Sequence, residues 1–320
     1  MGSFTKFKSI LEAKESFVLV CHVDPDGDAV GSMLALNEYL LSKGKRTSLL
    51  CKDVVPKLFT FLNGVESIGR LFPSIDKETA IVLLDNGDFR RTGFQSEILQ
   101  AREDGVSVIN LDHHPKNDLW KMVTVNCAND KSSSTSEVLY ELFIGLDYDL
   151  TPIVATALLT GIYFDTGGFR HSNTSNKVLS IASELLKRGA RLKKITENID
   201  NTRPFSLFKL WGIALERLRL NKKYGLSISV ITLKDIKQVG ASEEDVSGLV
   251  NLLNSVPESE VAMLLCESFD AKIKGSLRTE SDKIDVSRLA KLFGGGGHKK
   301  AAGFTINGRI ELDGNKWKIV

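Results

Sequence analysis

The sequence has few cysteines, little net charge and no long hydrophobic run, and each shortage excludes a class of protein. Its four cysteines stand singly, with no Cys-x-x-Cys pair in 320 residues, which predicts small buried residues in a reducing compartment. A net charge of +2 gives no overall attraction to nucleic acid or membrane, so any basic patch must be local. The longest apolar stretch, near residues 153–164, is shorter than the ~18 residues that a membrane span needs. Since no signal peptide opens the chain, we expect a cytoplasmic protein without a membrane partner.

The first half of the chain has the pattern of a parallel sheet with helices on both faces. Short β-branched runs alternate there with amphipathic segments, as in βαβ units. The expected strands are residues 17–23, 47–51, 80–84, 106–111 and 122–125. Helices are expected at 29–42, 152–164, 175–188, 192–199 and 204–220. A further helix is expected to begin at a capping box formed by Ser134 and Glu137.

Strand patterns return in the last third of the chain. They occupy residues 226–233, 261–266, 272–277 and 302–306, with a helix at 284–293. Because 320 residues also exceed the usual size of one core, the sequence predicts two α/β domains. We expect a catalytic domain over residues 1–188, a helical linker over 189–220 and a smaller domain over 221–320.

Two loops rich in aspartate and histidine follow strand-like runs. Residues 22–28 read His-Val-Asp-Pro-Asp-Gly-Asp, and residues 112–115 read Asp-His-His-Pro. In open parallel sheets the loops beyond the carboxyl ends of the strands converge on one crevice. A third run leads to Asp85, and Asp165 follows the helix expected at 152–164. The sequence therefore predicts one metal-binding cluster, with the ligands His22, Asp26, Asp28, Asp85, His113 and Asp165.

Each loop has a simpler interpretation when it is taken alone. Residues 22–28 could be a solvated turn or the opening of an EF-hand, but an EF-hand needs glycine after the third acid, where this chain has Ala29. The loop at 112–115 could be a capped turn with two exposed imidazoles. Arg90 and Arg91, which follow Asp88, could reach a phosphate, but a solvated loop is the favoured interpretation.

Taken together, the six side chains are enough for two metal ions and one bridging carboxylate. The mixture of carboxylate and imidazole ligands favours Mn²⁺ over Mg²⁺ or Zn²⁺. Two such ions stabilise both the attacking and the leaving oxygen of an in-line displacement at phosphorus. His114 exceeds the expected ligand count and could contact the scissile phosphate or protonate the leaving oxygen.

Four consecutive glycines, residues 294–297, predict an anion site in the second domain, because backbone amides can close around an anion there. His298, Lys299 and Lys300 follow them. The Gly-Lys-Ser/Thr ending of a Walker A loop is absent. With Arg278, whose planar fork suits phosphate, this turn is expected to bind another phosphate or a base of the substrate.

These motifs resemble those of the DHH phosphoesterase family joined to its DHH-associated C-terminal domain. Residues 22–32, 85–88, 112–117 and 161–167 look like the family's four N-terminal motifs, and residues 276–278 and 294–298 look like the substrate-holding signatures. The resemblance implies one Mn²⁺ on His22, Asp26 and Asp85, and a second on Asp28, Asp85, His113 and Asp165. It also implies that Asp112 orients His113 or His114, and that the substrate contacts Arg278, His298 and the backbone of Gly295, Gly296 and Gly297.

The two-domain layout is similar to that of the stand-alone family branch that degrades very short nucleotides. Such enzymes cleave linear dinucleotides such as pApA, and nanoRNA, to 5′-mononucleotides. Some open cyclic di-AMP, and some remove the 3′-phosphate from 3′-phosphoadenosine 5′-phosphate. We therefore expect a homodimeric phosphodiesterase with two Mn²⁺ ions and a short oligonucleotide as substrate, and we expect no long nucleic acid as a partner.

Two other functions stay open. A non-catalytic nucleotide sensor of the same fold is disfavoured by the intact set of ligands. A single-strand-specific exonuclease is disfavoured because the longer relatives of that kind carry an extra oligonucleotide-binding domain. Long-strand binding by this chain should be weak and strongly salt-dependent, since its net charge is small.

Overall fold

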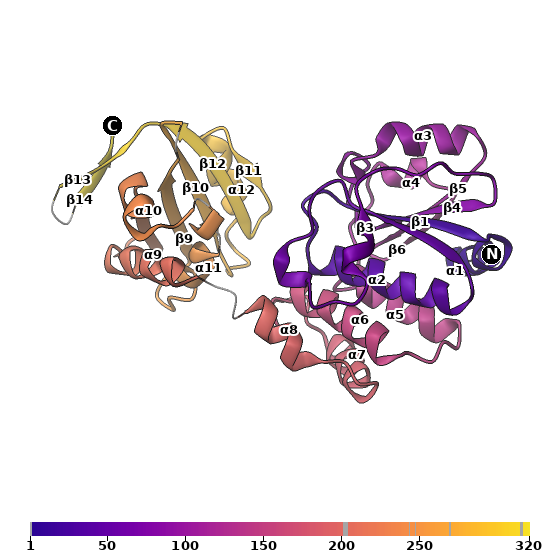
Figure 1. Cartoon of the computed structure of the whole chain (residues 1–320). Helices are drawn as coiled ribbons and strands as arrows, with labels where there is room; N and C mark the ends of the chain where they lie inside the picture. Colours follow the sequence, from indigo (N-terminus) through magenta and orange to yellow (C-terminus); the bar gives the residue numbers. More distant parts are fainter. Residues whose placement is uncertain (1, 201–203, 243, 247, 269, 314–315) are drawn as a thin grey trace. The chain divides into compact units, whose positions relative to one another are not determined.

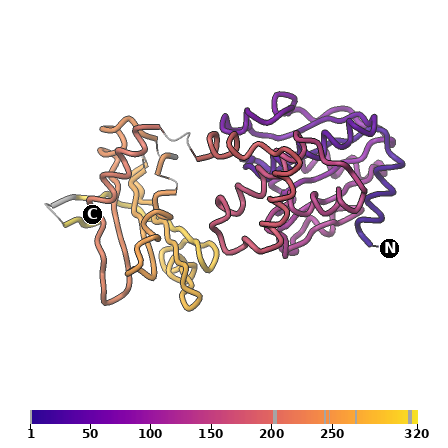
Figure 2. Tube along the Cα trace, turned by 90° about the horizontal axis from the view of Figure 1, so that it is seen from below, coloured from indigo at the N-terminus to yellow at the C-terminus, as the bar shows by residue number. Residues whose placement is uncertain are grey.

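The computed structural model describes residues 2–200, 204–242, 244–246, 248–268, 270–313 and 316–320. The chain divides into two compact units, Met1–Thr202 and Arg203–Val320, which Figure 1 and the trace in Figure 2 show. The division falls inside the segment 189–220 that the sequence predicts as a linker. That segment contains the helices α8 (Leu192–Ile199) and α9 (Phe205–Glu216). Among the described residues, the helices are all too short or too polar to cross a membrane.

The first unit is built on a six-stranded sheet in which every neighbouring pair of strands is parallel. The strands follow the order β3-β2-β1-β4-β5-β6. From β1 to β3 the strands are added toward one edge of the sheet, and from β4 to β6 toward the other, so the strand order reverses between β1 and β4. In open α/β sheets, ligands bind beyond the carboxyl ends of the strands at such a point. The strands are β1 (Ser16–Cys21), β2 (Arg46–Leu50), β3 (Ile68–Gly69), β4 (Thr79–Leu84), β5 (Ser107–Asp112) and β6 (Val125–Ala128).

Helices cover both faces of this sheet, as predicted (Figure 1). Alternate residues of β1 belong to different cores: Phe17 and Leu19 pack with α2, α5 and α6, whereas Val18 and Val20 pack with α3 and α4. Burial on both faces explains why these strands appear in the sequence as continuous apolar runs. The helices are α1 (Ser3–Ala13), α2 (Gly27–Ser42), α3 (Gln95–Glu103), α4 (Leu119–Met122), α5 (Thr135–Gly145), α6 (Pro152–Asp165) and α7 (Asn176–Lys187), with 3-10 turns η1 (Lys57–Phe59), η2 (Val65–Ser67) and η3 (Arg90–Thr92).

The second unit contains a mixed sheet in the order β11-β12-β10-β9-β8-β7, in which only the β8–β9 pair is parallel. Helices α9, α10 and α11 pack in one core and α12 packs in the other. This arrangement agrees with the expected smaller α/β domain. Its elements are β7 (Arg219–Asn221), β8 (Leu226–Ile231), α10 (Leu233–Val239), η4 (Glu244–Val246), α11 (Leu249–Leu253), β9 (Val261–Glu267), β10 (Lys272–Arg278), α12 (Val286–Leu292), β11 (Gly296–Gly297), β12 (Ala301–Asn307), and the hairpin β13 (Ile310–Asp313) and β14 (Lys316–Ile319).

Three predicted boundaries were wrong, and local hydrogen bonds explain two of them. The strand expected at 122–125 begins only at Val125, because residues 119–122 form α4, whose first amide donates to Asn117 Oδ1 at 3.0 Å. The helix expected at 204–220 ends at Glu216. The strand expected at 226–233 stops at Ile231, since Thr232 and Asp235 form a capping box that starts α10.

The capping box predicted for α5 is only half formed. Ser134 Oγ accepts from the amide of Glu137 at 3.1 Å, as expected, but the Glu137 carboxylate accepts from the amide of Ser133 at 2.7 Å and not from that of Ser134. Lys177 Nζ also lies 2.9 Å from Glu137. The buried Glu137 therefore binds the backbone at Ser133, one residue before the cap, and its ion pair with Lys177 links α5 to α7.

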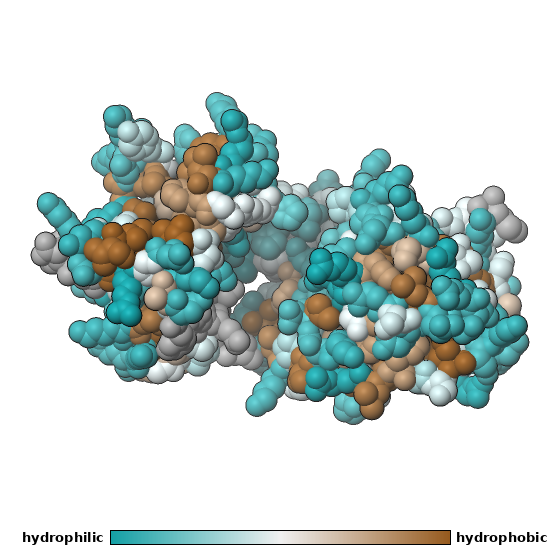
Figure 3. Space-filling model, turned by 90° about the horizontal axis from the view of Figure 1, so that it is seen from above, coloured by the Kyte–Doolittle hydropathy of each residue, from teal (hydrophilic) through white to brown (hydrophobic). Residues whose placement is uncertain are grey.

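Hydrophobic side chains on the surface stand in small patches among hydrophilic ones on the face shown in Figure 3. The most exposed of the large ones are Leu71 at 85% and Leu292 at 80%. Scattered exposed apolar residues of this kind are ordinary in folded proteins and indicate no interface by themselves.

Candidate metal centre

Five segments of the first unit bring the six predicted ligands together at the carboxyl edge of its sheet. His22 follows β1, Asp85 follows β4 and His113 follows β5, so two of the three strand ends flank the point where the strand order reverses. Asp26 caps α2 and Asp28 lies in its first turn, while Asp165 is the last residue of α6. Ligand atoms of His22, Asp26 and Asp85, and those of Asp28, His113 and Asp165, lie within 4.8 Å of one another in each group.

The carboxylate of Asp85 stands between the two histidines. Its Oδ2 lies 3.7 Å from His22 Nε2, and its Oδ1 lies 3.5 Å from His113 Nε2. These separations exceed a good hydrogen bond. Two ligand atoms that each lie about 2.1 Å from one cation are roughly 3 to 3.5 Å apart. The spacing therefore fits donors arranged around cations.

The outer ligands have similar spacing. Asp26 Oδ2 lies 3.6 Å from His22 Nε2, and Asp165 Oδ2 lies 3.2 Å from His113 Nε2. The other oxygen of Asp26 accepts from the amides of Asp28 and Ala29 at 2.9 and 3.0 Å. The cap of α2 thus fixes the direction in which Asp26 presents its free oxygen.

Asp85 has a backbone conformation that only a well-supported residue can keep. Its φ is +59°, in the left-handed region, which costs a non-glycine residue roughly 1 to 3 kcal/mol. Its amide donates to Leu111 O at 3.0 Å, which ties the turn to β5. Strain of this kind concentrates at functional sites.

The amino terminus of α5 orients two of the carboxylates, a contribution that the sequence analysis missed. The amides of Thr135 and Ser136 donate to Asp28 at 2.5 and 2.9 Å. The Thr135 hydroxyl donates to Asp85 Oδ1 at 3.0 Å. The Ser134 cap marks where this helix begins, but nothing in the sequence shows that the helix points at a residue more than a hundred positions earlier.

The electrostatics of the cluster show an excess of negative charge. Burial raises the pKa of Asp28 and of Asp165 well above the usual range, and neighbouring carboxylates add to the rise. Burial alone would lower the pKa of His22, but the neighbouring carboxylates of Asp26 and Asp85 raise it to about 10. Without metal, these side chains therefore tend to hold protons, which offset the negative charge of the cluster. Divalent cations would supply that positive charge instead.

Asp112, the last residue of β5, contacts His114. Its Oδ1 accepts from the His114 amide at 3.1 Å and lies 2.7 Å from His114 Nδ1, and its Oδ2 accepts from the Gly87 amide at 3.2 Å. The hydrogen bond to Asp112 is the main cause of the raised pKa of His114. This contact fixes the imidazole through Nδ1.

Arg91 also lies at the centre, so the solvated loop expected for it was wrong. Its Nη2 is 2.9 Å from His22 Nδ1, and its side chain is half-buried. Arg90, its neighbour, is exposed as expected. The sequence offered no signal to separate the two arginines, because the difference depends on the direction of one 3-10 turn.

The predicted substrate-binding residues of the second unit gather at one end of its sheet. Arg278 ends β10 and pairs with Ala301, the first residue of β12, and its Nε donates to Asn251 Oδ1 at 3.0 Å. Burial lowers the pKa of Arg278. His298 is exposed, and its amide donates to Ala301 O at 2.7 Å. Arg278 thus ends β10, and His298 lies in the turn that leads into β12, the strand that pairs with β10.

The glycine turn has clear packing reasons for its glycines. A Cβ on Gly295 would lie 2.1 Å from Gly303 O, and one on Gly297 would lie 2.6 Å from Ala301 O. The amide of Gly295 already donates to Ala290 O at 2.9 Å. The predicted anion contact therefore cannot use the amide of Gly295, and Gly296 and Gly297 pair with Gly303 and Ala302 of β12.

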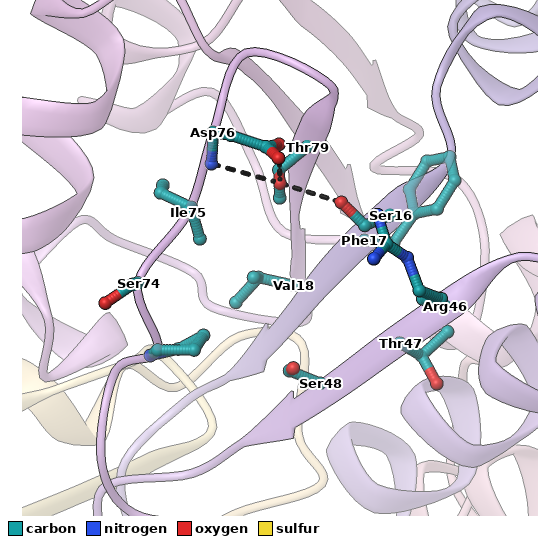
Figure 4. Close-up of a pocket in the computed structure, with 11 residues that line it drawn as sticks. Ser16, Phe17, Val18, Arg46, Thr47, Ser48, Ser74, Ile75, Asp76 and Thr79 are labelled. Atoms are coloured by element: carbon teal, nitrogen blue, oxygen red, sulfur yellow. Dashed lines mark hydrogen bonds between the residues drawn. The ribbon is translucent and has the colours of Figure 1, made fainter.

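A separate surface pocket lies at the amino-terminal ends of β1, β2 and β4 (Figure 4). Its polar side chains bind one another: Ser16 Oγ lies 2.7 Å from Thr79 Oγ1, which donates to Asp76 at 2.9 Å. The pocket is at the opposite edge of the sheet from the six ligands, so it is distinct from the metal centre.

Comparisons with known proteins identify the family of this chain. The family description "DHH family, N-terminal domain" matches residues 16–162, and "DHHA1 domain" matches residues 224–314. The chain is 31% identical over 305 residues to the "Bifunctional oligoribonuclease and PAP phosphatase NrnA" of Thermus thermophilus, covering 95% of this chain and 88% of that protein. A Bacillus subtilis protein of the same name is 26% identical, with 93% and 92% covered.

A solved structure has the same overall fold. An exopolyphosphatase-related protein from Bacteroides fragilis matches with a TM-score of 0.84 at 28% identity, covering 94% of this chain and 90% of that one. The chain therefore belongs to the DHH family, with a DHHA1 domain in its second unit, as its motifs predicted. It is a metal-dependent phosphoester hydrolase.

Proposed function

We propose that this enzyme hydrolyses short nucleotide phosphodiesters, namely pApA and nanoRNA, to 5′-mononucleotides with two Mn²⁺ ions. His22, Asp26 and Asp85 would hold one ion, and Asp28, Asp85, His113 and Asp165 would hold the other. The observation that carries the proposal is Asp85, whose two carboxylate oxygens each face a different histidine. A carboxylate in that position can bridge two ions.

The charge of the cluster supports two divalent ions in place of one. It contains five carboxylates, those of Asp26, Asp28, Asp85, Asp112 and Asp165, and the guanidinium of Arg91. With His114 protonated as well, five negative charges less two positive charges leave three, which is more than a single divalent cation balances. One divalent ion would leave one buried negative charge uncompensated, which is costly at low dielectric.

The protein side chains would orient the ions and transfer a proton. The ions, when bound, would stabilise the attacking and leaving oxygens of an in-line displacement. Asp112 holds His114 through Nδ1, which leaves Nε2 to donate a proton to the leaving oxygen. The raised pKa of His114 favours the protonated form that this role needs.

The choice of substrate rests on the relatives and on the second unit. The curated relatives from Thermus thermophilus and Bacillus subtilis are named as oligoribonucleases and PAP phosphatases. Removal of the 3′-phosphate from 3′-phosphoadenosine 5′-phosphate is thus a second candidate activity, and opening of cyclic di-AMP is a third. We propose that Arg278 and His298 bind a second phosphate or a base of the substrate, together with the backbone of Gly296 and Gly297. The homodimer and the cytoplasmic location stay predictions.

A steady-state comparison of pApA, nanoRNA, cyclic di-AMP and 3′-phosphoadenosine 5′-phosphate with Mn²⁺ tests the proposal. We expect pApA to yield AMP, and Asp85→Ala to lower kcat/KM at least about a thousand-fold through loss of bound metal. Asp104→Ala, at an exposed aspartate after α3, is the matched control. His114→Ala should keep its metal content and lose turnover. Binding of pApA without turnover by the wild-type chain would instead support the sensor.

A further inference from the structure

Arg91 belongs to a turn that is fastened to two loops of the metal centre. The amide of Val23, next to His22, donates to Arg91 O at 2.8 Å. The amide of Arg91 donates to Asp88 Oδ1 at 2.9 Å, three residues after Asp85. The backbone of Arg91 is therefore held in a fixed position relative to both loops.

The guanidinium of Arg91 lies between a predicted ligand and the predicted proton donor. Its Nη2 is 2.9 Å from His22 Nδ1. Its Nη1 and the ring of His114 both border Gly87, because a Cβ built on Gly87 would lie 3.3 Å from each. In the part of the chain that the structure describes, Arg91 forms no ion pair with a carboxylate.

The contact between Arg91 and His22 is incompatible with metal binding by His22. His22 Nδ1 also lies 2.6 Å from Val23 O. A guanidinium only donates hydrogen bonds and a carbonyl only accepts them, so one ring nitrogen cannot satisfy both partners at once. When Nε2 binds a cation, the ring proton is on Nδ1 and donates to a backbone carbonyl. Arg91 then has no acceptor on His22, although its charge stays at the edge of the centre.

We propose that Arg91 binds the phosphoryl oxygens of the substrate at the metal centre. This inference rests on the proposed function and adds one substrate-binding residue to it. The Nη2 of Arg91 lies beside the outer ring nitrogen of His22, and its Nη1 borders Gly87 together with the His114 ring. A planar fork of this kind binds two oxygens of a phosphate at once. The partner that replaces His22 Nδ1 is thus an anionic oxygen of a phosphodiester or of a product phosphate.

Inorganic phosphate is the probe that tests this role without catalysis. Wild type, Arg91→Ala and Arg91→Gln are loaded with Mn²⁺, the metal per chain is measured after desalting, and the Kd for phosphate is measured by calorimetry. We expect unchanged metal content and a Kd about ten- to a hundred-fold higher in both Arg91 variants. The control is Arg90→Ala, which removes the same charge from the exposed neighbour and should bind phosphate as the wild type does.

Two results would overturn the inference: loss of Mn²⁺ from the Arg91 variants in parallel with His22→Ala, or an unchanged Kd for phosphate. The first would mean that Arg91 only supports His22, and the second that Arg91 takes no part in binding phosphate. If Arg91→Ala does not fold, Arg91→Gln decides by the same criteria. Hydrolysis of pApA is measured separately on the wild type. If phosphate binding needs Arg91 but the wild type does not hydrolyse pApA, the proposed function alone is rejected. If the wild type hydrolyses pApA but phosphate binding does not need Arg91, this inference alone is rejected.

Discussion

Asp85 shows how far single residues could be predicted from the sequence. Its position after an apolar run placed it at a strand end, and the loops around His22 and His113 identified its neighbours. Thr135 and Arg91 could not be predicted, because their contacts with Asp85 and His22 join residues 50 and 69 positions apart. Such contacts depend on how a helix and a turn are aimed, which no local pattern records.

Replacing Thr135 by valine tests whether its hydroxyl orients the bridging carboxylate. Valine keeps the shape and removes the hydrogen bond to Asp85 Oδ1. Partners of this kind are worth about 10- to 100-fold in metal affinity, so we expect Mn²⁺ affinity, measured by calorimetry, to fall by that range. Thr160→Val is the control, since Thr160 is equally buried and donates to Thr156 O instead. Equal affinity in Thr135→Val and wild type would show that the hydroxyl has no orienting role.

At the scale of elements, two glycines let α2 and α6 pack closely enough to bring their carboxylates together. A Cβ on Gly31 would lie 2.4 Å from Ala157 O. A Cβ on Gly161 would lie 2.1 Å from Ser136 Oγ and 2.4 Å from Asp28 Oδ1. Both glycines stand inside motifs that the sequence showed, but only the packing explains why they are glycines.

Gly31→Ala should separate α2 from α6. Because the new methyl group meets a backbone oxygen, we expect the free energy of unfolding to fall by about 1–3 kcal/mol, with weaker Mn²⁺ binding. Gly145→Ala is the control: Gly145 ends α5 with open space around it, and alanine there should be neutral or slightly stabilising. Thermal melts of both variants measure the difference. A Gly31→Ala variant as stable as the wild type would show that close packing at Gly31 does not require glycine.

Element prediction worked where burial is continuous and failed where polar contacts decide. The buried strands β1, β4 and β5 and the apolar helix α6 were found within one or two residues of their ends. Helix α3 was missed because only Ile98 and Ala101 of its nine residues are buried. The end of β8 was misplaced because the Thr232–Asp235 cap, and not a change in hydropathy, starts α10.

The ion pair between Arg217 and Asp235 predicts how acid affects the second unit. Burial alone would raise the pKa of Asp235, but hydrogen bonds from Arg217 and Thr232 lower it below its usual range. The carboxylate therefore stabilises the fold above about pH 4, and this stabilisation is lost as the pH falls through the lower folded-state value.

Asp235→Asn should thus reduce the free energy of unfolding by about 2 kcal/mol at pH 7 and by less below pH 3. Denaturant titrations at the two pH values measure the difference. Asp270→Asn, which removes an exposed pair with Lys272, should change little at either pH. An acid-independent loss in Asp235→Asn would show that the ionised form has no stabilising role.

At the scale of the whole molecule, all six predicted metal ligands belong to the first unit, and Arg278 and His298 belong to the second. The sequence predicted this separation from the return of strand patterns. It could not fix the boundary, because residues on both sides of it have helical patterns and form α8 and α9. Two units with separate cores should respond differently to metal.

Mn²⁺ should therefore stabilise the first unit selectively. Binding to the folded state adds RT ln(1 + [L]/Kd), about 2.7 kcal/mol at a hundred times the Kd. Hydrogen exchange by mass spectrometry should show slower exchange with Mn²⁺ in β1, α2, β4 and α6, and unchanged exchange in β8 to β10. Protection spread equally over both units, or absent from both, would contradict the assignment of the ligands.

The anomalous signal of Mn²⁺ in crystals grown with that ion would show directly whether Asp85 bridges two ions. We expect two peaks in the first unit, about 3.5–4 Å apart, with a carboxylate oxygen of Asp85 beside each. One peak belongs near His22 and Asp26, and the other near His113 and Asp165. A single peak, or peaks remote from Asp85, would show that Asp85 does not bridge two metal ions.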